Sequence, residues 1–102
     1  MNISDLNGKA LNWAIAKCEG YDGEAIWLSR QSSASTDWEQ AGQIIERERI
    51  TIDASQHGRL WVARKGVNEP IIGPTPLIAA MRCYVASKLG NELDIPAELE
   101  GK

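Results

Sequence analysis

The spacing of apolar residues predicts two α-helices, one near each end of the chain. Between Asn7 and Gly20, apolar residues recur every three or four positions and form one stripe of a helix. A second helix is predicted from Pro76 to Leu89, because Thr75 is a favourable N-cap and Gly90 a favourable end. The apolar line of this second helix contains Ile78, Met81, Val85 and Leu89, widened by Leu77 and Tyr84. We therefore expect two amphipathic helices that face a common core.

Shorter apolar runs between these helices predict strands. The runs that are rich in strand formers are Ala25–Leu28, Arg49–Asp53 and Leu60–Ala63. A turn at Ser55–Gly58 joins the last two as a hairpin. The T-x-x-E spacing of Thr36 and Glu39 is that of a capping box and predicts a single helical turn. Loops are expected at 29–35 and 65–70.

Together these elements predict an α+β domain. Its sheet is expected to be small and mainly antiparallel, with about three strands, and to be covered on one face by the two amphipathic helices. A length of 102 residues is typical of one domain, so we expect residues 1–102 to form a single domain. The acidic tail 91–102 is expected either to lie along the surface or to be mobile.

Charge and cysteine usage narrow the classes of function. The net charge is −3, whereas a surface that coats DNA or RNA needs clustered positive charge. Cys18 and Cys83 form no C-x-x-C motif and have no paired histidines, so no metal or cofactor site is expected. The N-terminus lacks a secretory pattern, and no run of 18 apolar residues occurs. These features predict a reduced cytosolic protein with no membrane segment.

The candidates for catalysis each have a simpler structural interpretation. His57 is the single histidine, and a triad would have to draw on neighbours such as Ser55 or Asp53, which are common turn residues for backbone reasons. Glu46 and Glu48 could share one face of an extended segment as an acid–base pair, but flanking arginines favour a solvated, salt-bridged strand. We expect both thiols to be buried and inert. The chain is therefore expected not to be an enzyme.

The aromatic residues suggest a binding surface instead. The chain has four Trp and no Phe, and Trp is frequent among the energetic anchors of protein interfaces. Trp13, Trp27 and Trp61 are expected to fill the core, with Trp13 half-buried at its edge because it lies off the centre of its helix stripe. Trp38 lies between Asp37 and Glu39, so it is either an exposed anchor or locally packed. The candidate protein-binding surface consists of Trp38 and Asp37 with a polar rim formed by Glu46, Arg47, Glu48 and Arg49.

Four stretches carry a resemblance to a known family. They are Leu11–Gly20, Ser35–Trp38, Ile44–Ile50 and the long segment Gly73–Gly90. The chain resembles the NinX family of small proteins from lambdoid phages and prophages, whose function is generally described as unknown. It departs from the family pattern at Ala41-Gly42-Gln43, where a Gly-Gly-Pro turn is expected. The resemblance implies an accessory phage protein in the bacterial cytoplasm and supplies no catalytic residue.

Two functional hypotheses remain open at this stage. The first is a non-enzymatic accessory protein that binds a host or phage protein through the candidate surface together with the Ser-rich loop at 29–35. A homo-oligomer formed through a sheet edge or a Trp-bearing face is also an open possibility. The alternative is a small regulator that contacts nucleic acid through Arg59, Arg64 and Lys65, although the net charge argues against it.

Overall fold

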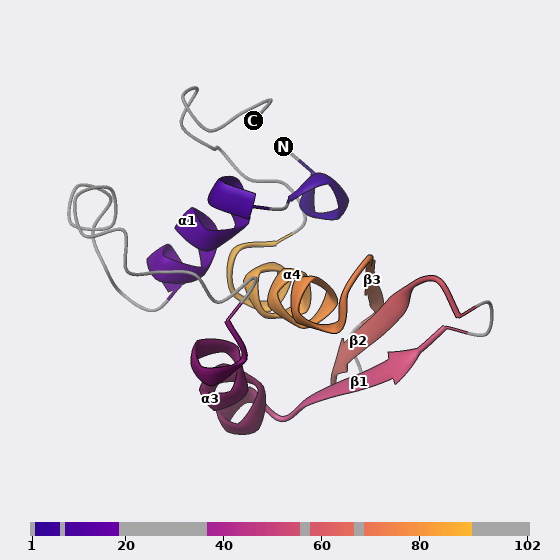
Figure 1. Ribbon diagram of the computed structural model, residues 1–102. Helices are drawn as coiled ribbons and strands as arrows, with labels where there is room; N and C mark the ends of the chain where they lie inside the picture. The colour runs from indigo at the N-terminus through magenta and orange to yellow at the C-terminus, as the bar shows by residue number, and fades with distance from the viewer. Residues whose placement is uncertain (1, 7, 19–36, 56–57, 67–68, 91–102) are drawn as a thin grey trace.

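The computed structural model describes residues 2–6, 8–18, 37–55, 58–66 and 69–90, and these form an α+β fold, as predicted. In chain order the elements are the 3-10 turn η1 (Ile3–Asp5), α1 (Gly8–Cys18), α3 (Trp38–Glu48), β1 (Ile50–Ala54), β2 (Trp61–Lys65), β3 (Ile71–Gly73) and α4 (Pro76–Leu89). Figure 1 shows the small sheet to one side of α4, with α1 and α3 on the other side. The predicted strand at 25–28, the Ser-rich loop at 29–35, Trp27, His57 and the acidic tail at 91–102 lie outside the described residues.

The sheet is antiparallel throughout, in the order β1-β2-β3. The predicted hairpin is confirmed: Ile52 lies opposite Ala63, and Ser55 closes the turn by donating its N–H to the carbonyl of Leu60 at 2.8 Å. Strand β3 was not predicted as a strand. It has only three residues, and its strand geometry depends on pairing with β2, where Gly73 lies opposite Trp61.

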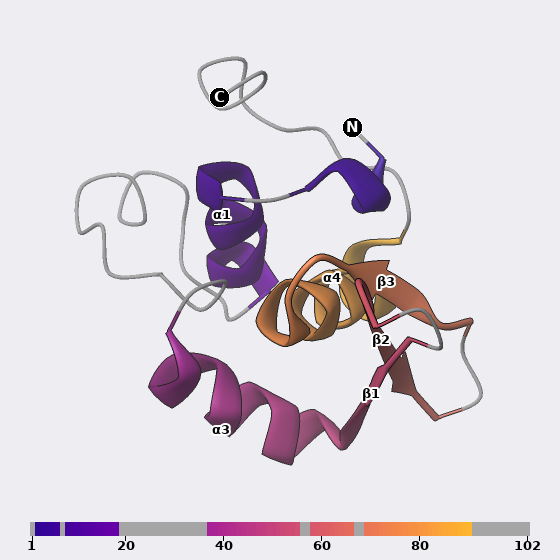
Figure 2. The ribbon, with the colours of Figure 1, turned by 45° about the vertical axis from the view of Figure 1, so that its right-hand side comes forward.

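Helix α4 occupies the centre of the fold. Its bounds, its N-cap Thr75, its N-terminal proline and its end at Gly90 agree with the prediction. Figures 1 and 2 show the sheet on one side of α4, with α1 and α3 packed against other sides. As a result α4 is buried nearly all round rather than along one stripe: Arg82 and Cys83 are buried, whereas Leu89 at its end is exposed. Helix α4 therefore covers the sheet, and α1 packs on α4.

Two contacts fix β3 against the rest of the molecule. A Cβ atom added to Gly73 would lie 2.6 Å from the backbone nitrogen of Ala79, so only glycine allows this approach of β3 to α4. The buried guanidinium of Arg82 donates from Nε to the carbonyl of Leu6 at 2.7 Å and from Nη1 to the carbonyl of Ile72 at 3.0 Å. Arg82 thus ties the N-terminal segment to β3 across α4.

The remaining helices differ in how well the sequence anticipated them. Helix α1 confirms the predicted N-terminal helix, and Trp13 is half-buried against the core, as expected. Two predictions are wrong in the segment that forms helix α3. The single turn expected at residues 36–39 and the strand expected around Glu46–Arg49 are both wrong, because one continuous helix of 11 residues spans Trp38–Glu48. Its buried face, Ala41 and Ile44, faces α4 and β1.

Candidate functional site

Every residue of the candidate surface belongs to α3 or to its two caps. Asp37 is the N-cap: its extended backbone lets Oδ1 accept the N–H of Glu39 at 2.9 Å. Arg49 is the C-cap and adopts the left-handed conformation, with φ 55°, while its N–H donates to the carbonyls of Glu46 and Ile45. A left-handed cap is a common way to end a helix. The predicted surface is therefore one helix about 16 Å long rather than a loop followed by a strand.

Trp38 is the most exposed large apolar residue in the described part of the chain, with 58% of its surface accessible. It is the first residue of α3 and lies at the edge of the helix face that packs on the core. The two possibilities left open by the sequence are thereby separated: Trp38 faces solvent and is not locally buried. Trp61, by contrast, packs against the core as predicted.

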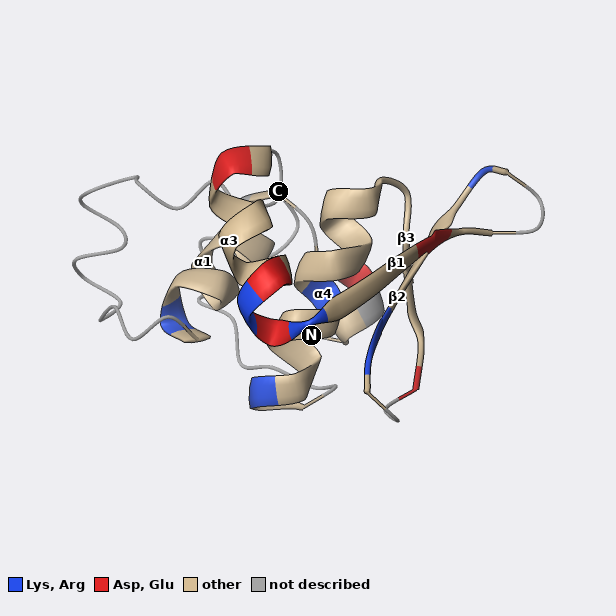
Figure 3. Cartoon of the chain, turned by 90° about the horizontal axis from the view of Figure 1, so that it is seen from below, with Lys and Arg blue, Asp and Glu red and all other residues tan. Residues whose placement is uncertain are grey.

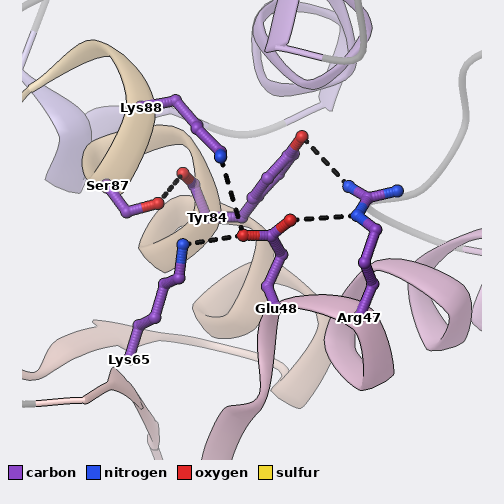
Figure 4. Close-up of polar contacts among 6 residues, drawn as sticks. All are labelled: Arg47, Glu48, Lys65, Tyr84, Ser87 and Lys88. Atoms are coloured by element: carbon purple, nitrogen blue, oxygen red, sulfur yellow. Dashed lines mark hydrogen bonds and ion pairs between the residues drawn. The ribbon is translucent and has the colours of Figure 1, made fainter.

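Glu48 lies at the centre of an ion cluster that joins three elements. Its Oε1 accepts a hydrogen bond from Lys65 Nζ of β2 at 2.7 Å and lies 3.7 Å from Lys88 Nζ of α4. Its Oε2 accepts from Arg47 Nε at 2.9 Å. Figure 4 shows the three cationic side chains converging on this one carboxylate. With only 12% of the Glu48 side chain exposed, the cluster fastens the end of α3 to the core.

Arg47 extends the ion cluster to a buried aromatic ring. Its Nη2 donates to the hydroxyl of Tyr84 at 3.2 Å, and its guanidinium lies 5.7 Å from the ring centre. Lys88 lies 6.0 Å from the same ring. Ser87 in turn donates its hydroxyl to the carbonyl of Tyr84 at 2.7 Å (Figure 4). Arg47 and Glu48 therefore both make contacts within the molecule, although 49% of the Arg47 side chain stays exposed and only 12% of the Glu48 side chain does.

The ion cluster also sets the acidity of Glu48. Hydrogen bonds from Lys65 and Arg47 lower the pKa of Glu48 from 4.5 to about 2, against a smaller desolvation effect that raises it. Glu48 is consequently ionised at neutral pH. Glu46, only two residues away, is exposed, since on a helix the two side chains project in directions about 160° apart. The geometry of an acid–base carboxylate pair is not formed by these two residues.

The two cysteines differ in burial. Cys83 is buried in α4, as expected, and desolvation raises the pKa of its thiol, which keeps it protonated. Cys18 at the end of α1 is half-buried, so the expectation that both thiols are buried is wrong for Cys18. Among the described residues, no group of three or more His, Cys, Asp or Glu side chains is placed to hold a metal ion. Within the same residues, no helix is long and apolar enough to cross a membrane.

The sequence did not identify the residues that hold the inner side of α3 against the core, nor the exposed carboxylate of Glu39 on its outer side. Lys65, Tyr84 and Lys88 hold the inner face, and no local pattern marks them because they come from distant segments. Glu39 on the outer face was noted only as part of a capping box. The spacing of Ala41, Ile44 and Ile45 is helical and could have identified the whole element.

The chain matches a known protein family over most of its length. The family described as Bacteriophage P22, NinX matches residues 2–88, which span α1, the sheet, α3 and nearly all of α4. The chain belongs to the NinX family. The resemblance seen in the sequence is thus confirmed, and NinX membership supports an accessory role in a phage. A search of curated proteins finds no match to this chain.

Proposed function

We propose that this NinX-family chain is a non-enzymatic phage accessory protein that acts in the bacterial cytoplasm by binding a host or phage protein. The single observation that carries the proposal is the exposure of Trp38 at the start of a helix whose inner face, Ala41 and Ile44, is buried against the core. Trp is the residue type most enriched among interface hot spots. A large exposed indole on a well-held helix is therefore a suitable anchor for a partner.

The ion cluster supports the proposal because it makes α3 a fixed platform. Lys65 and Lys88 hold Glu48 at the end of the helix, while Asp37 caps its start. A surface that is already ordered loses less conformational entropy on binding than a mobile one. The residues proposed to contact the partner are Trp38 and Glu46 with the flanking caps Asp37 and Arg49, whereas Arg47 and Glu48 position the helix.

Affinity capture with matched variants tests the proposal. Tagged wild type, Trp38→Ala and Leu60→Ala are used to capture proteins from phage-infected and uninfected lysate at physiological salt with nuclease added, followed by mass spectrometry. Leu60 is the control because it is also an exposed large apolar residue, with 40% of its surface accessible, but lies at the hairpin. We expect one partner that is retained by Leu60→Ala and lost by Trp38→Ala. A partner bound equally by both variants contradicts the role of α3.

The alternative function in nucleic-acid binding has less support. Its three basic residues do not share a surface, because Arg64 is exposed on the face of β2 away from α4, while Lys65 is bound to Glu48 on the inner face. Arg59 is exposed in the hairpin turn. Filter binding at low and physiological salt distinguishes this alternative, since phosphate contacts lose affinity steeply as salt increases.

A further inference from the structure

We propose that the segment recognised by α3 is basic: a stretch of the partner protein with Lys or Arg side chains that lies along the acidic outer face of α3 beside Trp38. This inference rests on the proposed function and adds the chemistry of the partner. We define the acidic outer face as Glu39, Gly42 and Glu46. Glu39 and Glu46 are seven residues apart, so their side chains project within about 20° of each other around the helix.

The two carboxylates of the acidic outer face differ from the one on the inner face of the same helix. Glu48 is neutralised by Arg47, Lys65 and Lys88. Glu39 and Glu46 are both exposed, and within the described residues no cation pairs with either side chain. Figure 3 shows acidic residues at both ends of α3, seen from below. The outer face of α3 therefore presents two carboxylates that form no ion pair within the described residues, although Arg47 and Arg49 are exposed beside Glu46.

Trp38 adds an exposed aromatic ring next to the acidic outer face. Trp38, Gly42 and Glu46 follow one another at i, i+4 and i+8, which is one ridge of a helix. At Gly42, a Cβ atom would meet nothing within 4 Å. There is thus open space beside Gly42, between an indole and a carboxylate, although Gly42 itself is half-buried. The side chains that fit this sequence of groups are Arg and Lys, whose apolar stems can lie over Gly42 while the cation contacts the carboxylate or the indole face.

Charge complementarity also argues against a second copy of this chain as the occupant. If two copies met through the acidic outer face, Glu39 and Glu46 of one copy would lie against the same carboxylates of the other. Like charges brought together at an interface weaken association. The chain as a whole carries a net charge of −3, which attracts a basic partner and repels another copy.

A peptide titration tests this inference. The probe is a short fluorescein-labelled amphipathic peptide rich in Arg and Leu, and its twin carries Glu in place of each Arg. Binding to the full chain is followed by fluorescence anisotropy at low and physiological salt. The test variant is Glu39→Gln with Glu46→Gln, and the control variant is Asp53→Asn with Glu69→Gln. Both double variants remove two exposed negative charges, but the control charges lie on β1 and in the loop after β2.

We expect the basic peptide to bind wild type and the acidic twin not to bind. The Glu39→Gln, Glu46→Gln variant should weaken binding about fivefold at low salt, the effect of two exposed ion pairs, and show a reduced salt dependence. Trp38→Ala should weaken binding about threefold at either salt concentration. Equal weakening by the control double variant, or equal binding of the acidic twin, would overturn the inference. A captured, Trp38-dependent partner with an acidic contact segment would also overturn it while leaving the proposed function intact.

Discussion

Replacement of Glu48 by Gln is expected to destabilise the fold in a pH-dependent manner. The substitution keeps the size of the side chain but removes the charge on which Lys65, Lys88 and Arg47 converge. Lowering a carboxyl pKa from 4.5 to about 2 corresponds to at most about 3–4 kcal/mol of stability. Solvent screens the cluster, since the Lys65 and Lys88 side chains are 27% and 43% exposed. We therefore expect a loss of about 1–2 kcal/mol at pH 7.

The sign of the pH dependence follows from the lowered pKa. A carboxyl group whose pKa is lower in the folded than in the unfolded state stabilises the fold fully above the unfolded value. The contribution of Glu48 is therefore complete above pH 4.5 and is lost as the pH falls from 4.5 through about 2. The difference in stability between wild type and Glu48→Gln should be largest near neutral pH and should shrink through this window.

Urea unfolding monitored by circular dichroism at several pH values measures this difference. Glu46→Gln is the matched control, because it removes the same charge from the same helix but from an exposed side chain that pairs with no cation in the described structure. We expect Glu46→Gln to change stability by less than about 0.5 kcal/mol. Equal effects of the two substitutions at pH 7 would refute the role of the ion cluster, as would a Glu48→Gln effect that does not vary with pH.

Three further predictions concern the glycines, Arg82 and Cys83. Gly73→Ala should destabilise the fold by about 2 kcal/mol because its methyl group would overlap the α4 backbone, whereas Gly42→Ala should stabilise it by about 0.5–1 kcal/mol; thermal unfolding compares the two. Arg82→Gln should cost about 2–4 kcal/mol by leaving buried carbonyl groups unsatisfied, and should speed hydrogen exchange in the N-terminal segment. The Cys83 thiol should react with a thiol reagent only after urea is added, which a reaction time course checks.

Local sequence signals were sufficient where they all agreed. Helix α4 begins after Thr75 with Pro76 and ends before Gly90, and each of these residues favours the observed boundary for a reason confined to its own turn of helix. The β1–β2 hairpin was found for a similar reason, because alternating apolar residues flank a polar turn. These elements could be predicted without knowledge of their neighbours.

The sequence was misleading where the structure depends on distant partners. The alternating charges of Glu46–Arg49 fit a solvated strand as well as the end of a helix, and the helix is held by Lys65 and Lys88 from other elements. Strand β3 has too few residues to show a pattern, and its pairing with β2 decides its conformation. The stripe predicted for α4 was too narrow because α1, α3 and the sheet surround that helix.

The candidate surface was only partly predictable for the same reason. Trp38 and Glu46 could be named because a large apolar residue between charges stands out in the sequence. Which of the neighbouring charges face outward depends on the helical geometry of α3. That geometry turns Glu48 inward and leaves Glu39 exposed. On the exposed side of α3, Glu39 therefore takes the place that was predicted for Glu48. The surface changes from a rim of mixed charge to a face with two carboxylates.

Photo-crosslinking in infected cells tests most directly whether the surface around Trp38 contacts a protein. A photoreactive aromatic amino acid, which keeps a large apolar ring at the anchor position, is introduced in place of Trp38 in one variant and in place of Leu60 in another. Both positions are exposed large apolar residues, so the probe can reach a partner from either, and the two variants differ mainly in location on the fold. The account predicts a discrete crosslinked protein from position 38 that is absent from position 60. No crosslink from position 38, or the same product from both positions, would contradict the account.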